Sequence, residues 1–436
     1  MKPGTPNASA RPARTLAQKL IARACGRTDV LPGEIVTCQV DLAMFHDSSG
    51  PRRLAPMLQE LGAPIWNKDR VALVMDHFVP AQDEHARRIV HIARDWAREQ
   101  ALPHVYDSIG ICHVVLPQNG HIRPGMFCVG GDSHSPTGGA FGAYMFGIGS
   151  TEMLGVLVTG EIWVRVPRTL RMQWDGHLAP GIQAKDMALH MIGRFGMNGA
   201  DYQAVEFCGS AVRALSMQER MTLSNLSAEM GAQVGLIAPD DTTRSWLAKA
   251  GVPSDVIDTE AWQSDAVADG SAEATKHLFD ASALAPQVAA PHSPANTAHV
   301  AAFSDIAVQV AYVGACTGAK LDDLRAAAQV LRGKRIASST RLMVAPASLH
   351  DQSAAEAEGV LGALLDAGAE LLPTACGACS GYGGSIPEGA TVIATTARNF
   401  KGRMGSASAQ VYLASPYTVA ASALRGRISD VRDMLA

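Results

Sequence analysis

The chain has 436 residues, of which 47% are hydrophobic and 18% are charged, a composition typical of an enzyme with much buried α/β structure. The formal net charge is −4 and no dense basic run occurs, which excludes the charge pattern of a surface that binds nucleic acid or an anionic membrane. No apolar stretch reaches the length of a membrane span, and the first residues lack the apolar region of a secretory signal. Eight cysteines are too few for a disulfide scaffold, so we expect reduced thiols and a cytoplasmic protein.

The first hundred residues predict strands and helices in alternation. We expect a flexible tail at 1–14, a helix at 15–24, strands at 34–45 and 70–78, and an amphipathic helix at 83–100. Asp76 and His77 stand at the end of the second predicted strand. Because α/β folds place their chemistry at the carboxyl ends of parallel strands, this pair is a candidate for function. The alternative is that it only caps the next helix.

A glycine-rich segment at 130–153 surrounds Asp132 and His134. Glycine is used where the backbone must turn tightly or be approached closely. The segment is not a phosphate-binding loop, because no Gly-Lys-Ser/Thr ending follows. We expect its last residues, "GIGSTEM", to begin a helix, and the glycines to allow close packing near a functional site.

The chain is predicted to have two main parts after the tail. The stretch at 284–297 is rich in proline and alanine and marks the expected boundary, so one part covers 15–290 and the other 291–436. Apolar strands and helices alternate in the second part, which predicts a parallel sheet. The fold class is therefore α/β.

Three cysteines occupy predicted turns between strands and helices: Cys316 in "GACTGAK", and Cys376 and Cys379 in "CGAC". Cys-x-x-Cys alone is weak evidence, since it also occurs as a redox pair, half of a zinc site or two buried thiols. No second pair completes a four-ligand zinc site. Three thiolates suit an iron–sulfur cluster that leaves one iron free as a Lewis acid, and the spacing alone leaves these alternatives open.

Many motifs typical of one protein family occur in the same order along the chain: "TLAQKLIAR", "DHFVP", "GICH", "GGDSH", "QAVEF", "ALSMQERMTL", "CTGAKLDDLRAAA", "CGAC" and "RNFKGRMGS". With them the chain resembles the aconitase superfamily, most closely the large subunits of 3-isopropylmalate dehydratase. The resemblance implies a three-domain α/β/α core with parallel sheets around a cluster cleft, without the swivelling fourth domain. It also implies a hydro-lyase, which removes water beside carboxylates and adds it back.

The resemblance assigns roles to matching residues. One [4Fe–4S] cluster per subunit would be held by Cys316, Cys376 and Cys379, with one iron not held by a cysteine. The residues expected to handle protons and iron-bound water are Asp76, His77, His113, Asp132, His134 and Glu206. The residues expected to bind substrate are Arg398, Arg403 and His46. Taken singly, each has a plainer structural interpretation; Glu206, in an apolar strand, would be one half of a structural pair.

The family's proton-abstracting serine lies in a segment that this sequence lacks. The resemblance therefore implies a small-subunit partner that carries the swivelling domain and the base, with a small hydroxy diacid as substrate. Homoaconitate, citraconate (2-methylmalate) and dimethylmalate remain alternative substrates. The rival functions are an iron sensor that binds RNA without its cluster, which the net charge disfavours, and a zinc or redox protein. The family's usual residues are replaced at Gly131, Gly318, Ala378 and Ala397, which indicates a divergent member.

Overall fold

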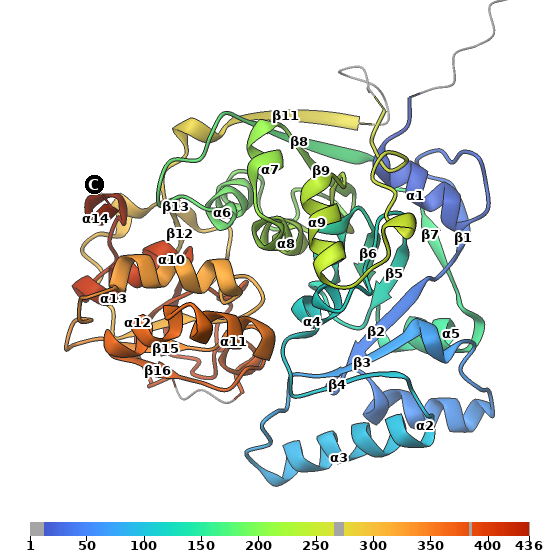
Figure 1. Cartoon of the computed structure of the whole chain (residues 1–436), viewed down its shortest axis with the longest axis horizontal. Helices are drawn as coiled ribbons and strands as arrows, with labels where there is room; N and C mark the ends of the chain where they lie inside the picture. Colours follow the sequence, from blue (N-terminus) through green and yellow to red (C-terminus); the bar gives the residue numbers. More distant parts are fainter. Residues whose placement is uncertain (1–12, 266–273, 383–385, 436) are drawn as a thin grey trace, which may run out of the picture.

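The computed structural model describes residues 13–265, 274–382 and 386–435 (Figure 1). Most of the expected tail at 1–14 lies outside the described residues. The fold begins with α1 (Leu16–Ala24), close to the predicted helix, and Thr15 is its N-cap. Thr15 and Gln18 form a capping box, in which each side chain accepts a hydrogen bond from the other residue's backbone N–H.

A five-stranded parallel sheet, in the order β4-β3-β2-β5-β6, forms the first layer. Its strands are β2 (Leu42–His46), β3 (Val71–Met75), β4 (His104–Asp107), β5 (Phe127–Gly130) and β6 (Tyr144–Gly147). The helices of this part are α2 (Pro51–Leu61), α3 (Glu84–Glu99), α4 (Cys112–Gln118) and α5 (Ser150–Thr159), and an antiparallel ribbon joins β1 (Ile35–Gln39) to β7 (Glu161–Arg165). Strands β2 and β3 are buried at every residue, as parallel strands covered on both faces should be.

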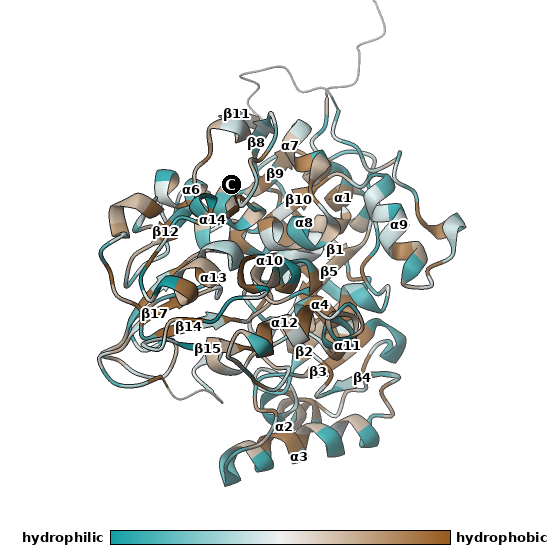
Figure 2. Cartoon of the chain, turned by 60° about the vertical axis from the view of Figure 1, so that its left-hand side comes forward, coloured by the Kyte–Doolittle hydropathy of each residue, from teal (hydrophilic) through white to brown (hydrophobic). Residues whose placement is uncertain are grey.

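Helices α2, α3 and α5 lie on the same side of this sheet, where α3 contacts β3 and α5 contacts β2. Figure 2 shows hydrophilic and hydrophobic residues in alternating bands along α3. Its buried residues recur at helical spacing, namely Ala86, Ile89, Val90, Ala93, Trp96 and Ala97. This periodicity is why the helix could be predicted from the sequence.

A second parallel sheet has the order β10-β9-β8-β11. Its strands are β8 (Thr169–Asp175), β9 (Ala204–Cys208), β10 (Val234–Ile237) and β11 (Ala274–Asp280). The helices here are α6 (Ala184–Phe195), α7 (Ser210–Ala214), α8 (Met217–Leu226) and α9 (Asp241–Lys249). Helix α8 is buried at every residue except Glu219, so it is a central helix of the molecule.

The third sheet has seven strands in the order β13-β12-β18-β17-β14-β15-β16, and is parallel except at β12 and β13. Its strands are β12 (Gln287–Ala289), β13 (Thr297–His299), β14 (Val310–Val313), β15 (Arg341–Val344), β16 (Ala369–Leu371), β17 (Thr391–Ala394) and β18 (Gln410–Leu413). Its helices are α10 (Leu321–Leu331), α11 (Leu349–Ala357), α12 (Val360–Asp366), α13 (Pro416–Arg425) and α14 (Arg432–Leu435).

The stretch at 284–297 is not a bare linker. It contains β12 and the start of β13, and β12 pairs with β18, so it belongs to the third sheet. The change from one sheet to the next falls between β11 and β12, slightly before the expected boundary at 290. A short antiparallel edge was missed because alanine and proline carry little strand signal. Within the described ranges, every helix is too short or too polar to cross a bilayer.

The glycines at 130–149 allow backbone segments to touch. A Cβ on Gly139 would lie 1.9 Å from the carbonyl oxygen of Gly235 in β10, so a side chain there is excluded. A Cβ on Gly130 would lie 1.9 Å from the hydroxyl of Ser135. Close packing is therefore the use of this segment, and α5 begins at Ser150 where the helix was expected.

Candidate active site

Several predicted residues meet at the carboxyl edge of the first sheet. His46 ends β2, Asp76 follows β3, and Asp132 follows β5 after Gly131. His113 joins them from the first turn of α4. All four residues are buried except Asp132, whose side chain is 18% exposed. The parallel register of these strands brings together residues that lie up to 86 positions apart in the chain.

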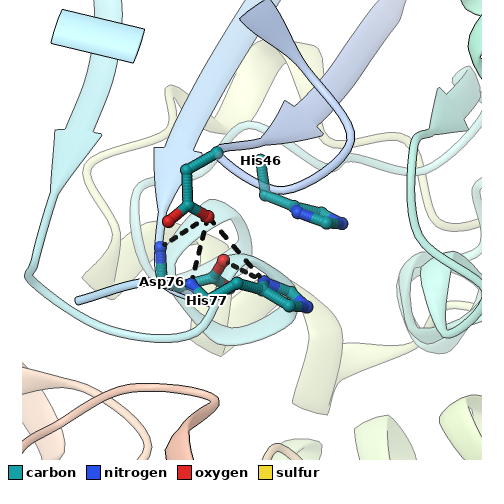
Figure 3. A group of neighbouring side chains, drawn as sticks. His46, Asp76 and His77 are labelled. Carbon is teal, nitrogen blue, oxygen red and sulfur yellow. Dashed lines mark hydrogen bonds and ion pairs between the residues drawn. The ribbon is translucent and has the colours of Figure 1, made fainter. Parts of the chain in front are cut away.

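Asp76 and His77 form a hydrogen-bonded pair. Asp76 Oδ1 lies 2.6 Å from His77 Nδ1, and Asp76 Oδ2 accepts the backbone N–H of Cys112 at 2.7 Å. Figure 3 shows the ring of His46 beside that of His77, and the centroids are 3.9 Å apart at 11°. Burial disfavours a charged His77, but the charge and hydrogen bond of Asp76 outweigh it and raise the pKa of His77 to about 9. Burial and the neighbouring His77 lower the pKa of His46 to about 4.

Asp47 anchors the turn that carries this pair, and the sequence had not singled it out. Its Oδ1 accepts the N–H groups of Asp76 at 3.4 Å and His77 at 3.1 Å, and its Oδ2 accepts that of Phe78 at 2.8 Å. Asp47 is fully buried. Burial and the charge of Asp76 raise the pKa of Asp47. The charge of His77 and the backbone hydrogen bonds act in the opposite direction but do not cancel this rise.

A second group is centred on Asp132. Its Oδ1 lies 2.7 Å from His113 Nε2 and accepts the backbone N–H of His134 at 2.8 Å. Its Oδ2 lies 3.7 Å from His46 Nε2, which joins the two groups. Burial would raise the pKa of Asp132, but the charge and hydrogen bond of His113 outweigh it and hold that pKa well below its usual value.

Glu229 is a site residue that the sequence analysis missed. Its Oε1 lies 2.9 Å from His134 Nε2 and accepts a hydrogen bond from Arg398 Nε at 2.7 Å, and its side chain is 1% exposed. Burial would raise the pKa of Glu229, but His134 and Arg398 together lower it. The available signal was an acid in "NLSAEMGA", directly after the buried helix α8.

The structure does not bring Glu206 to this site. Glu206 lies in β9 and is buried, but its carboxylate accepts a hydrogen bond from Ser264 at 3.2 Å and lies 3.6 Å from Arg171. The N-terminus of α1 also donates to it through the N–H of Leu16. These contacts favour the structural interpretation of Glu206, and the carboxylate that lies beside His134 and Arg398 is that of Glu229.

The three predicted cysteines come from two turns of the third part. Cys316 follows β14, and its sulfur receives a hydrogen bond from Asn225 Nδ2 in α8 at 3.3 Å. Cys376 and Cys379 stand in a 3-10 turn, and the N–H of Cys376 donates to the carbonyl of Asp76 at 2.8 Å. That bond joins the cysteine loop directly to the Asp76–His77 turn.

The three sulfurs do not all lie close enough together to be ligands of one ion. Among the described residues, the groups whose ligand atoms lie within 4.8 Å of one another do not include the three thiols. Each thiol nevertheless acts electrostatically on the others: burial and the charge of Cys379 raise the pKa of Cys316 to about 12. The hydrogen bond from Cys376 and the charge of Arg403 lower the pKa of Cys379, although burial opposes them. Three thiols around a shared space fit a multi-iron cluster better than a single zinc.

Arg398 and Arg403 approach from the same side as the cysteines. Arg398 and Asp132 line a cavity of about 390 Å³ that also includes Ser133, Ile148 and Tyr202. Arg403 is partly buried beside Cys379, and its Nε has no hydrogen-bond partner within the described residues. A buried guanidinium with a free donor is suited to binding an anion that is not part of this chain.

The fold and this site define an enzyme of acid–base chemistry on anionic substrates, with acid–histidine pairs, arginines and three clustered thiols. Comparison with known proteins gives the family. A model of the Aconitase family (aconitate hydratase) matches residues 26–305 and 297–426. The chain therefore belongs to the aconitase family of hydro-lyases, as its motifs predicted.

Similar proteins cover almost the whole chain. The 3-isopropylmalate dehydratase large subunit 1 of Methanopyrus kandleri is 42% identical over 97% of this chain and 100% of that protein. The 3-isopropylmalate dehydratase large subunit of Desulfatibacillum aliphaticivorans is 37% identical over 96% and 99%. Among solved structures, Thermococcus kodakaraensis aconitase X in its holo-form has a TM-score of 0.51 at 12% identity, covering 85% of this chain and 88% of that one. At that identity the structure supports the fold only.

Proposed function

We propose that this chain is the large subunit of a hydro-lyase of the 3-isopropylmalate dehydratase type, which interconverts 2- and 3-hydroxy isomers of a malate-like diacid. The observation that carries the proposal is the contact between Asp76 and Cys376. It joins the turn of the acid–histidine pair to the loop that carries Cys376 and Cys379, which supports a shared site. The relatives at 37–42% identity carry this name, and this chain spans nearly their full length.

Cys316, Cys376 and Cys379 would hold a [4Fe–4S] cluster with one iron free of cysteine. Two buried polar atoms with no partner in the described part of the chain, Arg403 Nε and Tyr312 Oη, support this fit, because both belong to residues influenced by the thiols. When bound, such a cluster supplies a Lewis acid that makes hydroxide a better leaving group. The zinc and redox alternatives do not account for the free donors.

The chain's own residues would then move protons and bind carboxylates. The His77 imidazolium, paired with Asp76, donates its proton to the departing hydroxyl, which leaves as water. Asp132, with His113 and His134, orients that water for the return reaction on the other carbon. Arg403 and the remaining N–H groups of Arg398 bind the carboxylates, while Glu229 holds Arg398 in place.

The base that removes the carbon-bound proton would come from a small-subunit partner. The relatives are named as large subunits, which supports a small-subunit partner. A complex is therefore needed for activity. Homoaconitate, citraconate or 2-methylmalate, and dimethylmalate remain possible substrates, because part of the pocket would belong to the partner.

The test is anaerobic co-expression with the small subunit encoded in the same genome, followed by iron and sulfide analysis and assays on this panel of diacids. We expect about four irons and four sulfides per large subunit, and formation of the unsaturated intermediate from one of the diacids. The matched control is Cys316→Ala, which should lose iron and activity but not association. A cluster-loaded complex that turns over none of the panel would refute the proposed reaction, and zinc in place of iron would refute the cofactor.

A further inference from the structure

Tyr312 in β14 has a buried hydroxyl with no visible purpose in the fold. The residue is 0% exposed, and its Oη has no hydrogen-bond partner among the described residues. A hydroxyl left unpaired in a protein interior costs about 1–3 kcal/mol. Native proteins rarely keep such a group unless a ligand or water completes it.

The tip of the ring lies against the turn that carries the first cysteine. A Cβ on Gly314 would lie 2.2 Å from Tyr312 Oη, so glycine is required at 314 to leave room for the hydroxyl. Gly314 stands two residues before Cys316. On the same face of the sheet, Tyr312 shares its hydrophobic core with Ala378, the residue between Cys376 and Cys379. The ring therefore lies against the turn that leads to Cys316, and it packs in the same core as the turn of Cys376 and Cys379.

All three thiols influence this hydroxyl. Burial, followed by the charges of Cys379, Cys376 and Cys316, raises the pKa of Tyr312 well above its usual value. The phenol is thus a neutral O–H donor at any working pH.

The neighbouring polar groups are already engaged with one another. Thr395 Oγ1 accepts from the N–H of Gly314 at 2.8 Å and donates to its carbonyl at 2.8 Å. The ammonium of Lys185 donates to the carbonyls of Thr395 and Thr396, the latter at 2.8 Å. No side chain can reach inward from position 318 either, since a Cβ on Gly318 would lie 2.1 Å from that of Thr395.

We propose that the Tyr312 hydroxyl donates a hydrogen bond to a sulfur of the bound iron–sulfur cluster, either a cysteine sulfur or an inorganic sulfide. The inference rests on the proposed function, because it needs the cluster. Tyr312 is a positioning and tuning residue and does not touch substrate. A hydrogen bond to a cluster sulfur stabilises the more negative, reduced state and so raises the reduction potential.

The test compares the wild-type complex with Tyr312→Phe, which removes the hydroxyl and little else. Redox titration followed by electron paramagnetic resonance measures the midpoint potential of the reduced cluster. We expect a lower potential in Tyr312→Phe, faster loss of iron in air, and loss of one exchangeable proton coupling that wild-type protein shows in water but not in D₂O. The matched control is Tyr144→Phe, which removes another fully buried hydroxyl, one that donates to Gln233 at 2.6 Å.

The outcomes separate the inference from the proposed function. If wild-type protein takes up no [4Fe–4S] cluster, both are overturned. If it holds the cluster and Tyr312→Phe has the same potential, iron loss and proton couplings as wild type, only the role of Tyr312 is overturned. An equal shift of potential in Tyr144→Phe would also overturn it. Should Tyr312→Phe lose its cluster on purification, an equal or higher melting temperature of the cluster-free variant against cluster-free wild type supports the inference, because the unpaired hydroxyl stabilises nothing there, and a lowered one overturns it.

Discussion

His46 and His77 are stacked 3.9 Å apart, yet their pKa values are driven in opposite directions, to about 4 and about 9. The difference comes from their partners. His77 has a carboxylate 2.6 Å from its Nδ1, whereas the Nδ1 of His46 is buried and has no partner in the described part of the chain. A neutral ring thus lies against a charged one at neutral pH, and only His77 is ready to donate a proton.

This asymmetry predicts the pH dependence of the reaction. Because His77 must be protonated to act as the acid, kcat should fall as the pH rises through about 9. His77→Gln should lower kcat by about 10²–10⁴-fold, the usual contribution of a general acid, and should remove this alkaline limb. The measurement is kcat against pH for both proteins. A wild-type limb that persists unchanged in His77→Gln would assign it to another group.

The same pair predicts how stability depends on pH. The folded pKa of His77 lies above its ordinary value of 6.5, so its stabilising contribution is complete below pH 6.5 and is lost as the pH rises through about 9. His46 has the opposite sign: its folded pKa lies below 6.5, so stability falls as the pH drops from 6.5 toward 4. Melting temperatures of His46→Gln and wild type should converge at neutral pH and separate near pH 4, with wild type the lower.

Glu229 and Glu206 allow a matched comparison of two buried acids. Glu229→Gln weakens the hydrogen bonds that position His134 and Arg398, so we expect kcat/KM to fall by about 10²-fold or more. Glu206→Gln weakens contacts to Arg171, Ser264 and the N–H of Leu16, and should lower the melting temperature while leaving kcat/KM within about twofold. Steady-state kinetics measure kcat/KM of both variants. A larger loss of kcat/KM in Glu206→Gln than in Glu229→Gln would assign the catalytic role to Glu206.

Residues at the ends of predicted strands could be found from the sequence, whereas residues whose partners lie in distant segments could not. Asp76, His77 and the cysteines stand at strand ends, where local pattern and function coincide, and the fold brings them together. Glu206 lies beside Ser264 and Arg171 and not with these residues, because a motif match does not say which way a strand's side chain points. Glu229 and Asp47 were missed because their partners lie in distant segments: Glu229 meets His134 across 95 positions. The packing of α8 against the segment Ser135–Phe141, which follows His134, creates that contact.

Asp47 should prove as important for structure as for activity. Both of its oxygens accept backbone N–H groups, so in Asp47→Asn at least one N–H must face an amide NH₂ that cannot accept. We expect a loss of about 1–3 kcal/mol in the free energy of unfolding and a lower kcat, because the Asp76–His77 turn loosens. The control is Asp95→Asn, a partly exposed acid on the surface of α3 paired with Arg98 and His91, which should change stability by only a few tenths of a kcal/mol, if at all. Denaturant unfolding measures both, and equal effects would contradict the anchoring role.

The packing role of the glycine-rich segment is tested by adding one methyl group. In Gly139→Ala the new Cβ would lie 1.9 Å from the carbonyl oxygen of Gly235, and because that atom is backbone, β10 must move. We expect a loss of about 1–3 kcal/mol, seen as a lower melting temperature, together with reduced activity because α8 and the Asp132 turn share this contact region. Gly155→Ala is the matched control: it lies in α5 with nothing within 4 Å of the new Cβ, and should be neutral or stabilise by about 0.5–1 kcal/mol. If Gly139→Ala melts at the wild-type temperature, the glycines of this segment are not there for close packing.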